Sequence, residues 1–165
     1  MKLSTVTFSL EIPTETVLRT LDSQLESIDV AENAAFEVAT RAGFEGLSLD
    51  RIGLAVREIV TNAIVHGNRY DRRKKVFVAV SRTPSRLEIS ISDQGAGFDP
   101  NAVSDPLGPE ALLQPSGRGL FLARIFTDEL YVRQGDLCGA TVVLVKYVNG
   151  FAGSRTPSRT DSHTL

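Results

Sequence analysis

A β-hairpin predicted between residues 76 and 92 sets the main limit on how this chain can fold. Residues 76–80 form a continuous apolar run, and residues 87–91 alternate apolar with polar side chains, as a half-buried strand does. Pro84 and Ser85 lie between the two runs, where the chain must turn. A hairpin joins its strands in opposite directions, so we expect a mostly antiparallel sheet.

Two helices are predicted before this hairpin. Apolar residues recur every four positions between about residues 29 and 42, and Gly43 follows as a helix stop. A second apolar stripe continues from about residue 50 to residue 66 and ends at a Gly-Asn pair. Ser48 or Asp50 is expected to cap the second helix, because short polar side chains accept hydrogen bonds from its free N–H groups.

The first 28 residues are expected to form an N-terminal strand region. Residues 5–12 alternate strictly between polar and apolar side chains, which predicts a half-buried strand that ends at Pro13. Residues 16–21 fit either helical spacing or an extended segment that pairs back after the turn. We favour the extended alternative.

A long irregular loop is predicted after the hairpin. Residues 94–116 contain seven Gly or Pro residues, too many for long regular structure, with room for one short helical turn. Loops of this length inside a compact domain usually act as lids or binding loops. Residues 118–126 then predict a helix, and residues 129–133 and 141–148 predict two further strands.

The predicted elements give two or three helices on one face of a mostly antiparallel sheet, which is an α+β two-layer sandwich. A single domain is expected over residues 1–148, and the polar tail, residues 149–165, is expected to be flexible. A length of 165 residues is sufficient for one domain with a sizeable core.

Composition narrows the class of protein. Hydrophobic residues make up 42% of the chain and charged residues 23%, as in ordinary globular proteins. The net charge of −2 provides no broad positive field for nucleic acids or membrane surfaces, so neither is an expected partner. The single cysteine, Cys138, cannot form an internal disulfide, and the N-terminus lacks the apolar core of a signal peptide. We therefore expect a cytoplasmic protein.

Glu58 and Asn62 form the first pattern that suggests chemistry. They are four residues apart on the second predicted helix, so their side chains meet on one surface. A carboxylate beside a carboxamide supplies hard oxygen atoms for a divalent cation and a water or hydroxyl. The alternative for an isolated pair of this kind is a solvated polar edge.

Asp93 begins the second pattern. It continues the buried side of the strand that contains Ile89 and Ile91, so its carboxylate should point inward and needs a hydrogen-bond donor. Gly95 and Gly97 follow, and glycines permit close approach of the backbone to a planar or anionic group. An ordinary Asp-x-Gly turn that leaves a strand is the structural alternative.

The third pattern lies at the expected start of the helix over residues 118–126. Gly117, Arg118, Gly119 and Leu120 lie where free backbone N–H groups and the helix dipole favour an anion. A glycine hinge that only starts the helix is the alternative. The spacing matches neither a P-loop nor a dinucleotide-binding Rossmann motif.

The three patterns occur in a fixed order, as Glu58-x-x-x-Asn62, Asp93-x-Gly95-x-Gly97 and Gly117-x-Gly119-Leu120. In this order they resemble the GHKL superfamily of ATP-binding domains, shared by DNA gyrase, heat-shock chaperones of the ninety-kilodalton class, mismatch-repair ATPases and sensor histidine kinases. The resemblance runs from about residue 29 to residue 147. Residues 57–67 look most like the small anti-sigma-factor serine/threonine kinases. The resemblance implies the Bergerat ATP-binding fold.

The resemblance also implies a role for each motif. Glu58 would be the general base, and Asn62 would ligate the Mg²⁺ that bridges the ATP phosphates. Asp93 would accept a hydrogen bond from the adenine amino group, and Gly95 and Gly97 would border the base.

The third motif would approach the phosphates through Gly117, Arg118, Gly119 and Leu120. Residues 99–116 would form a mobile ATP lid. Thr141 would lie beside Asp93 near the adenine.

As a function, the resemblance implies an ATP-dependent protein serine/threonine kinase that acts as an anti-sigma factor. Such a kinase binds a sigma factor in one state and phosphorylates an antagonist protein in the other, and related kinases are typically homodimers. One alternative is an ATP-binding module that sequesters a partner without productive phosphotransfer. Another is an ATPase module from a larger enzyme.

Overall fold

The five strands of the described chain form one sheet in which every neighbouring pair is antiparallel. The computed structural model describes residues 11–97, 115–135 and 138–148. The strand order is β1-β2-β3-β5-β4. The elements are β1 (Glu15–Asp22), α1 (Ser27–Arg41), α2 (Gly46–Asn62), a π-helical turn η1 (Ala63–Gly67), β2 (Lys75–Arg82), β3 (Arg86–Ser92), α3 (Pro115–Phe126), β4 (Glu129–Gln134) and β5 (Ala140–Tyr147).

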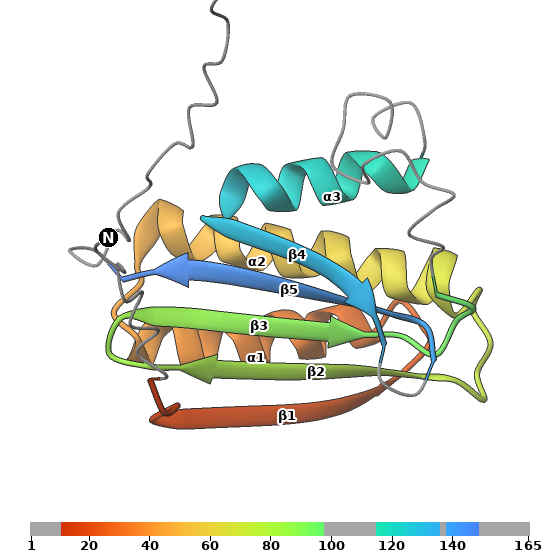
Figure 1. Cartoon of the computed structure of the whole chain (residues 1–165), viewed down its shortest axis with the longest axis horizontal. Coiled ribbons are helices and arrows are strands. Elements are labelled where there is room, and N and C mark those ends of the chain that lie inside the picture. Colours follow the sequence, from red (N-terminus) through yellow and green to blue (C-terminus); the bar gives the residue numbers. More distant parts are fainter. Residues whose placement is uncertain (1–10, 98–114, 136–137, 149–165) are drawn as a thin grey trace, which may run out of the picture.

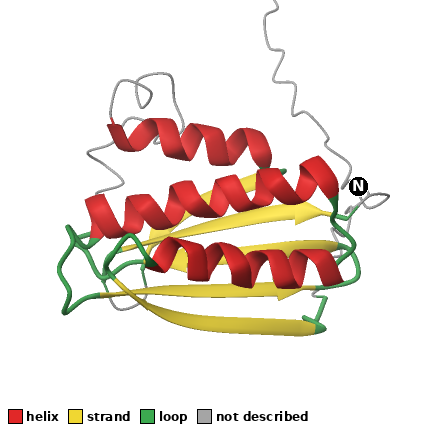
Figure 2. Cartoon of the chain, turned by 180° about the vertical axis from the view of Figure 1, so that it is seen from behind, coloured by secondary structure: helices red, strands yellow, loops and turns green. Residues whose placement is uncertain are grey.

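All three α-helices cover the same face of the sheet, which confirms the expected α+β two-layer sandwich. Figure 1 shows the strands in front of the helices, and Figure 2 shows the helical layer from the other side. In both views α2 lies between α1 and α3 (Figures 1 and 2). The sheet is fully antiparallel in its described strands, as the predicted hairpin required.

The core lies between α2 and the central strands. The alternate β3 residues Leu87, Ile89 and Ile91 face the helices and are buried, as are Val80 and Val78, which pair with Ile89 and Ile91. The apolar side of α2 packs over this surface. The largest fully buried side chains are Ile52, Ile59, Ile64, Leu87, Ile91, Leu144, Val38, Val56, Val60, Val76, Val78 and Val80.

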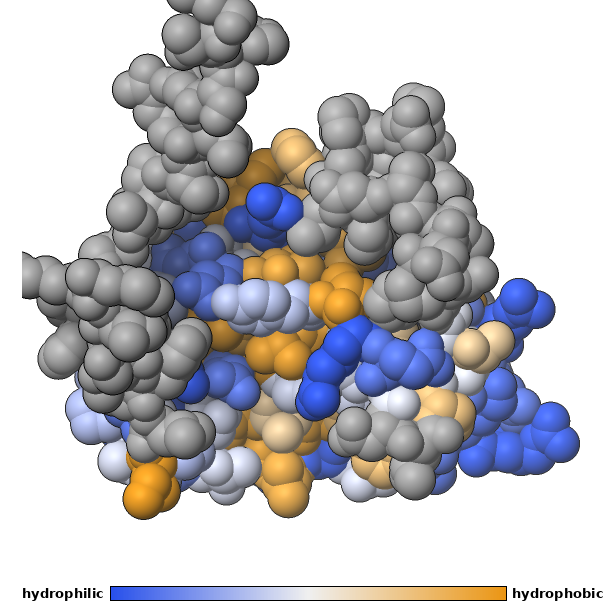
Figure 3. All heavy atoms as spheres, in the orientation of Figure 1, coloured by the Kyte–Doolittle hydropathy of each residue, from blue (hydrophilic) through white to orange (hydrophobic). Residues whose placement is uncertain are grey.

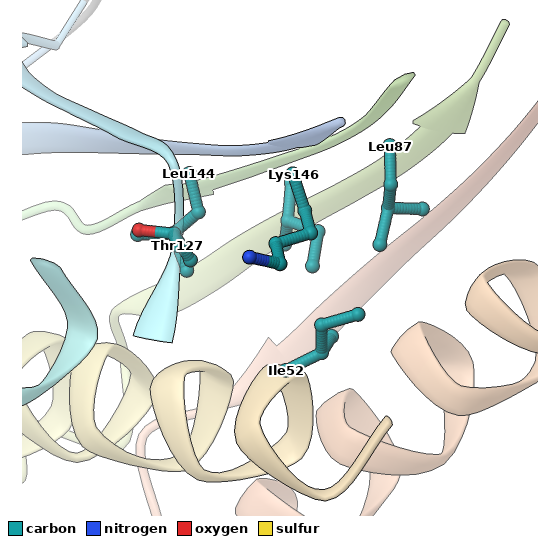
Figure 4. Close-up of a pocket in the computed structure, with 6 residues that line it drawn as sticks. Ile52, Leu87, Thr127, Leu144 and Lys146 are labelled. Atoms are coloured by element: carbon teal, nitrogen blue, oxygen red, sulfur yellow. The ribbon is translucent and has the colours of Figure 1, made fainter. Parts of the chain in front are cut away.

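A narrow apolar space beneath the first half of α2 is not a ligand site. Figure 4 shows Ile52 of α2 facing Leu87, Leu144 and Lys146 of the sheet. This space has no room for a water molecule. None of the described helices is long and apolar enough to cross a membrane.

The N-terminal region differs from expectation at one point. Residues 16–21 are extended within β1, as favoured, and β1 pairs with β2. Most of the strand predicted over residues 5–12 lies outside the described residues. Its last residue, Ile12, is 83% exposed and lies in no strand, so the prediction that it faces a buried side is wrong.

Two helix starts also differ from expectation. The helix α2 begins at Gly46 with Glu45 as its N-cap, so Ser48 lies in the first turn, Asp50 lies after it, and neither caps the helix. The helix α3 begins at Pro115, three residues before the predicted start. Proline is well suited to the first helical position, because its missing N–H needs no partner there. The last two residues of the predicted lid, 115 and 116, therefore belong to α3, and residues 98–114 lie outside the described chain.

Candidate functional site

Glu58 and Asn62 lie where α2 faces α3. Both are half-buried, and Gly119 of α3 packs directly against them. A Cβ atom added to Gly119 would lie 2.9 Å from Glu58 Oε2 and 3.1 Å from Asn62 Nδ2. Only a glycine allows the α3 backbone this close approach. Glu58 and Gly119 are 61 residues apart in the chain, so the first and third sequence motifs meet only in the fold.

Replacing Gly119 with alanine tests this contact. Alanine favours a helix by up to about 1 kcal/mol over glycine, so the free energy of unfolding should not fall. The added methyl group would displace Glu58 or Asn62, and a shift of about 1 Å can cost about 100-fold in rate. We expect Gly119→Ala to reduce phosphotransfer by about that factor, with Leu122→Ala, an exposed change on the same helix, as the control. A Gly119→Ala protein with full activity would contradict the proposed crowding.

Asp93 lies at the other end of the site, and its inward orientation is confirmed because only 8% of it is exposed. Its Oδ1 accepts hydrogen bonds from the N–H groups of Gly95 (2.8 Å) and Ala140 (3.3 Å). Burial raises the pKa of Asp93, whereas these two donors and the charge of Lys74 oppose the rise. Among the described residues no donor reaches Oδ2, which leaves this atom for a ligand donor.

Three glycines surround Asp93. A Cβ atom would lie 2.4 Å from Asp93 Cγ at Gly67 and 2.9 Å from Oδ1 at Gly95. At Gly139, whose φ is +75°, it would lie 2.1 Å from the carbonyl oxygen of Asp93. The absence of side chains at these positions lets three separate backbone segments pack directly against Asp93.

The two ends of the site belong to one continuous helical segment. Gly67, which contacts Asp93, follows Asn62 by five residues through η1. Five helical residues advance the chain by roughly 7 Å. A ligand with an aromatic hydrogen-bond donor at one end and an anionic group at the other could therefore contact both ends.

Asn68 fixes the loops around Asp93. It is fully buried, and its Nδ2 donates to Ser23 Oγ (2.8 Å) and to the carbonyl oxygen of Lys75 (2.9 Å). Its Oδ1 accepts from the N–H of Gln94 (2.8 Å), the residue after Asp93. One side chain thus connects the ends of β1 and η1 with the start of β2 and the end of β3.

The substitution Asn68→Ala should be strongly destabilising. It removes three hydrogen bonds, two of which are made to the part-buried backbone groups of Lys75 and Gln94. We expect the free energy of unfolding to fall by about 2–4 kcal/mol, measured by urea denaturation. Asn33 is exposed on α1, so Asn33→Ala is the matched control and should change the free energy of unfolding by less than about 0.5 kcal/mol. If the two substitutions lowered the free energy of unfolding equally, Asn68 would not stabilise the loops around Asp93.

Thr141 is not brought to Asp93. It lies opposite Ser92 in the sheet, and their hydroxyl oxygens are 2.8 Å apart. Side chains alternate along a strand, so Thr141 and Asp93 point to opposite faces. Ala140 pairs with Asp93 instead. The N–H of Asp93 donates to the carbonyl oxygen of Ala140 (3.0 Å), and the N–H of Ala140 donates to the side-chain Oδ1 of Asp93 (3.3 Å). The expectation that Thr141 lies beside Asp93 therefore needs correction.

The other predicted residues are distributed around the site. Gly97 has a φ of +78° and packs against Gln134 and Gly139. Gly117 lies in the first turn of α3, Arg118 is exposed, and Leu120 packs against the core. The structure thus brings Gly119 to Glu58 and Asn62, whereas the neighbouring Arg118 is exposed.

The site also contains residues that sequence reasoning missed. The sequence predicted only a helix stop at Gly67 and Asn68 and suggested no role for Gly139. Their contacts with Asp93 or with the adjacent Gln94 depend on segments far apart in the chain. The one local signal for Gly139 is its position two residues before the strand predicted over residues 141–148.

The side chains of this site suit Mg²⁺ that is shared with a substrate better than a metal ion that is bound by protein ligands alone. Within the described ranges, no three His, Cys, Asp or Glu side chains are grouped to hold a metal ion. Magnesium commonly binds one or two protein oxygen ligands and completes its shell with waters and substrate phosphates. The Asn62 carboxamide, beside the glycine of α3, can supply such a ligand.

Comparison with known proteins gives a family match over most of the chain. Residues 21–146 match the family described as histidine kinase-like ATPase domain. The serine-protein kinase RsbW of Bacillus subtilis (strain 168) is 30% identical over 134 residues, covering 78% of this chain and 82% of the relative. RsbW of Bacillus licheniformis is 31% identical over 118 residues, covering 68% and 72%.

Two solved structures share the fold. The RsbU and RsbW domains of Rv1364c from Mycobacterium tuberculosis match with a TM-score of 0.58 and 21% identity, over 81% of this chain. This chain covers 32% of that longer chain. The mycobacterial sensor histidine kinase MprB matches with a TM-score of 0.52 and 20% identity, over 79% of this chain and 97% of that one.

Proposed function

The chain belongs to the histidine kinase-like ATPase domain family, and from this membership we propose that it is an ATP-dependent protein serine/threonine kinase. The two named relatives are serine-protein kinases, and they align over most of their own length. The observation that carries the proposal is the contact of Gly119 with both Glu58 and Asn62, which joins a carboxylate, a carboxamide and a helix N-terminal turn.

ATP fits the two ends of this site. At one end Asp93 offers Oδ2 as an acceptor for the adenine amino group, and the glycine backbones packed around Asp93 hold its carboxylate in place. At the other end Asn62 would hold Mg²⁺, which when bound neutralises charge on the phosphates. The first turn of α3 adds backbone N–H groups that favour an anion.

The reaction transfers the γ-phosphoryl group of ATP to a serine or threonine hydroxyl. Glu58 accepts the hydroxyl proton while the oxygen forms a bond to the γ-phosphorus atom. The bond between the γ-phosphorus and the bridging oxygen breaks, and ADP leaves with that electron pair. No other described residue forms a hydrogen bond or ion pair with the Glu58 carboxylate, so it is available to orient the hydroxyl.

The partners follow from the same proposal. The kinase would act as an anti-sigma factor that holds a sigma factor in one state and phosphorylates a protein antagonist in the other. We place this activity in the cytoplasm, where ATP is abundant and the single cysteine stays reduced. A second copy of the chain is a further expected partner.

Phosphotransfer from γ-labelled ATP separates this proposal from the alternative of sequestration alone. Candidate antagonist proteins from the source genome are incubated with the chain, ATP and Mg²⁺, and labelled protein is mapped to its phosphorylated residue. We expect stable label on serine or threonine of one antagonist. Nucleotide-dependent binding of that antagonist with no label would favour a module that only sequesters its partner.

A further inference from the structure

The segment that runs from the end of η1 to the first residue of β2 concentrates positive charge. Five of the seven residues from Arg69 to Lys75 are Arg or Lys, whereas the whole chain has a net charge of −2. In Figure 1 this loop forms the right-hand edge of the molecule, and Figure 3 shows hydrophilic residues gathered at that edge. We call residues 69–75 the basic loop.

Two of these positive charges form no ion pair within the described chain. Arg73 pairs with Asp71 at 2.9 Å and lowers the pKa of Asp71 to about 2, and Lys75 pairs with Asp22 at 2.5 Å. Arg69 and Arg72 are exposed, and neither forms an ion pair with a described carboxylate. These two guanidinium groups are therefore available to an external anion.

The backbone of the basic loop holds an unfavourable conformation. Arg69 and Tyr70 have φ values of 53° and 58°, in the left-handed region that costs about 1–2 kcal/mol for each residue other than glycine. Hydrogen bonds from Tyr70 N–H to Ile64 (2.9 Å) and from Asp71 N–H to Asn68 (3.0 Å) maintain it. Such conformations are concentrated at functional sites, because a surrounding network must hold them.

The side chains of the basic loop suit a protein partner. Tyr70 is 51% exposed between exposed arginines, and Tyr and Arg are enriched where proteins bind each other tightly. A nucleic acid would require phosphate contacts over a wider basic surface than one loop provides. We propose that the basic loop docks an acidic segment of a partner protein.

Binding of an acidic segment requires no phosphotransfer, so it can be tested independently of the proposed kinase activity. The loop adjoins the Asp93 end of the site, because Lys75 N–H donates to Gln94 Oε1 at 2.6 Å. A docked segment would lie beside the nucleotide and away from Glu58. The hydrogen bonds of Asn68 connect both regions.

Fluorescence anisotropy tests the docking with a short fluorescein-labelled peptide of alternating Glu and Ala residues. The wild-type chain should bind this peptide at low ionic strength and less tightly as salt is added. The double variant Arg69→Glu/Arg72→Glu should bind it roughly tenfold more weakly. The control variant Arg51→Glu/Arg124→Glu reverses two exposed charges outside the loop and should stay within about twofold of the wild type.

Four results would overturn the proposal. The first is that the wild type does not bind the peptide, and the second is that the loop and control variants lose peptide affinity equally. The third is that the wild type binds a short DNA duplex more tightly than the peptide, and the fourth is that MgATP displaces the peptide fully. Circular dichroism establishes that the variants are folded. If the charge reversal prevents folding, Arg69→Gln/Arg72→Gln takes its place, with an expected loss of roughly threefold.

Discussion

The substitution Glu58→Gln should abolish most phosphotransfer while ATP binding is retained. The amide keeps the size and hydrogen-bonding reach of the carboxylate but cannot accept the proton of the attacking hydroxyl. General base catalysis typically contributes about 100- to 10,000-fold, so we expect a rate loss in that range. Single-turnover transfer of the γ-phosphoryl group from labelled ATP to the antagonist measures it.

Two comparisons make this result specific to Glu58. Glu37→Gln changes an exposed glutamate on α1, away from the contact with α3, and should leave the rate unchanged. The dissociation constant for ATP should change by less than about threefold in Glu58→Gln, because the carboxylate acts on the acceptor hydroxyl. Equal rates for Glu58→Gln and the wild type would remove Glu58 as the general base.

The substitution Asp93→Asn should weaken ATP binding without unfolding the protein. The amide oxygen can still accept from Gly95 and Ala140, but an NH₂ group then stands in place of the free Oδ2 acceptor. Losing a hydrogen bond to a charged group costs about 1.5–3 kcal/mol, which corresponds to roughly 10- to 150-fold in affinity. Isothermal titration calorimetry with ATP measures this change.

Inosine triphosphate provides the matching control ligand, because it carries a carbonyl oxygen where ATP carries the amino group. The wild type should prefer ATP, and Asp93→Asn should lose this preference. Asp50→Asn, at an exposed position on α2, should keep it. If Asp93→Asn binds ATP as tightly as the wild type and still discriminates against inosine triphosphate, Asp93 does not recognise the adenine.

The same variant has a predictable effect on the pH dependence of stability. Because burial raises the pKa of Asp93, the folded chain retains a proton that the unfolded chain has already released. This residue therefore contributes stability below its unfolded pKa, and the contribution is lost as the pH rises through its folded pKa. Thermal melts between pH 3 and pH 7 should show that the wild type loses stability with rising pH relative to Asp93→Asn.

Features that depend on local periodicity were predictable from the sequence. The spacing of Glu58 and Asn62 predicted that they share a helix surface, and alternation along β3 predicted that Asp93 points inward. Both patterns repeat within a single element, so no long-range information was needed. The antiparallel sheet followed from the hairpin in the same way.

Features that depend on contacts between distant segments were not predictable. The position of Thr141 requires the register between β3 and β5, and a difference of one residue moves a side chain to the other face. The need for glycine at positions 67 and 139 arises only when both segments reach Asp93. Pro115 looked like a helix breaker because its position at the first helical residue depends on where α3 begins.

A crystal structure with a non-hydrolysable ATP analogue and Mg²⁺ tests the central claim most directly. We expect the adenine amino group within hydrogen-bonding distance of Asp93 Oδ2 and the metal bound by the Asn62 side chain. The γ-phosphate should lie between the first turn of α3 and Glu58. An analogue bound elsewhere, or bound with its adenine away from Asp93, would contradict the assignment of the site.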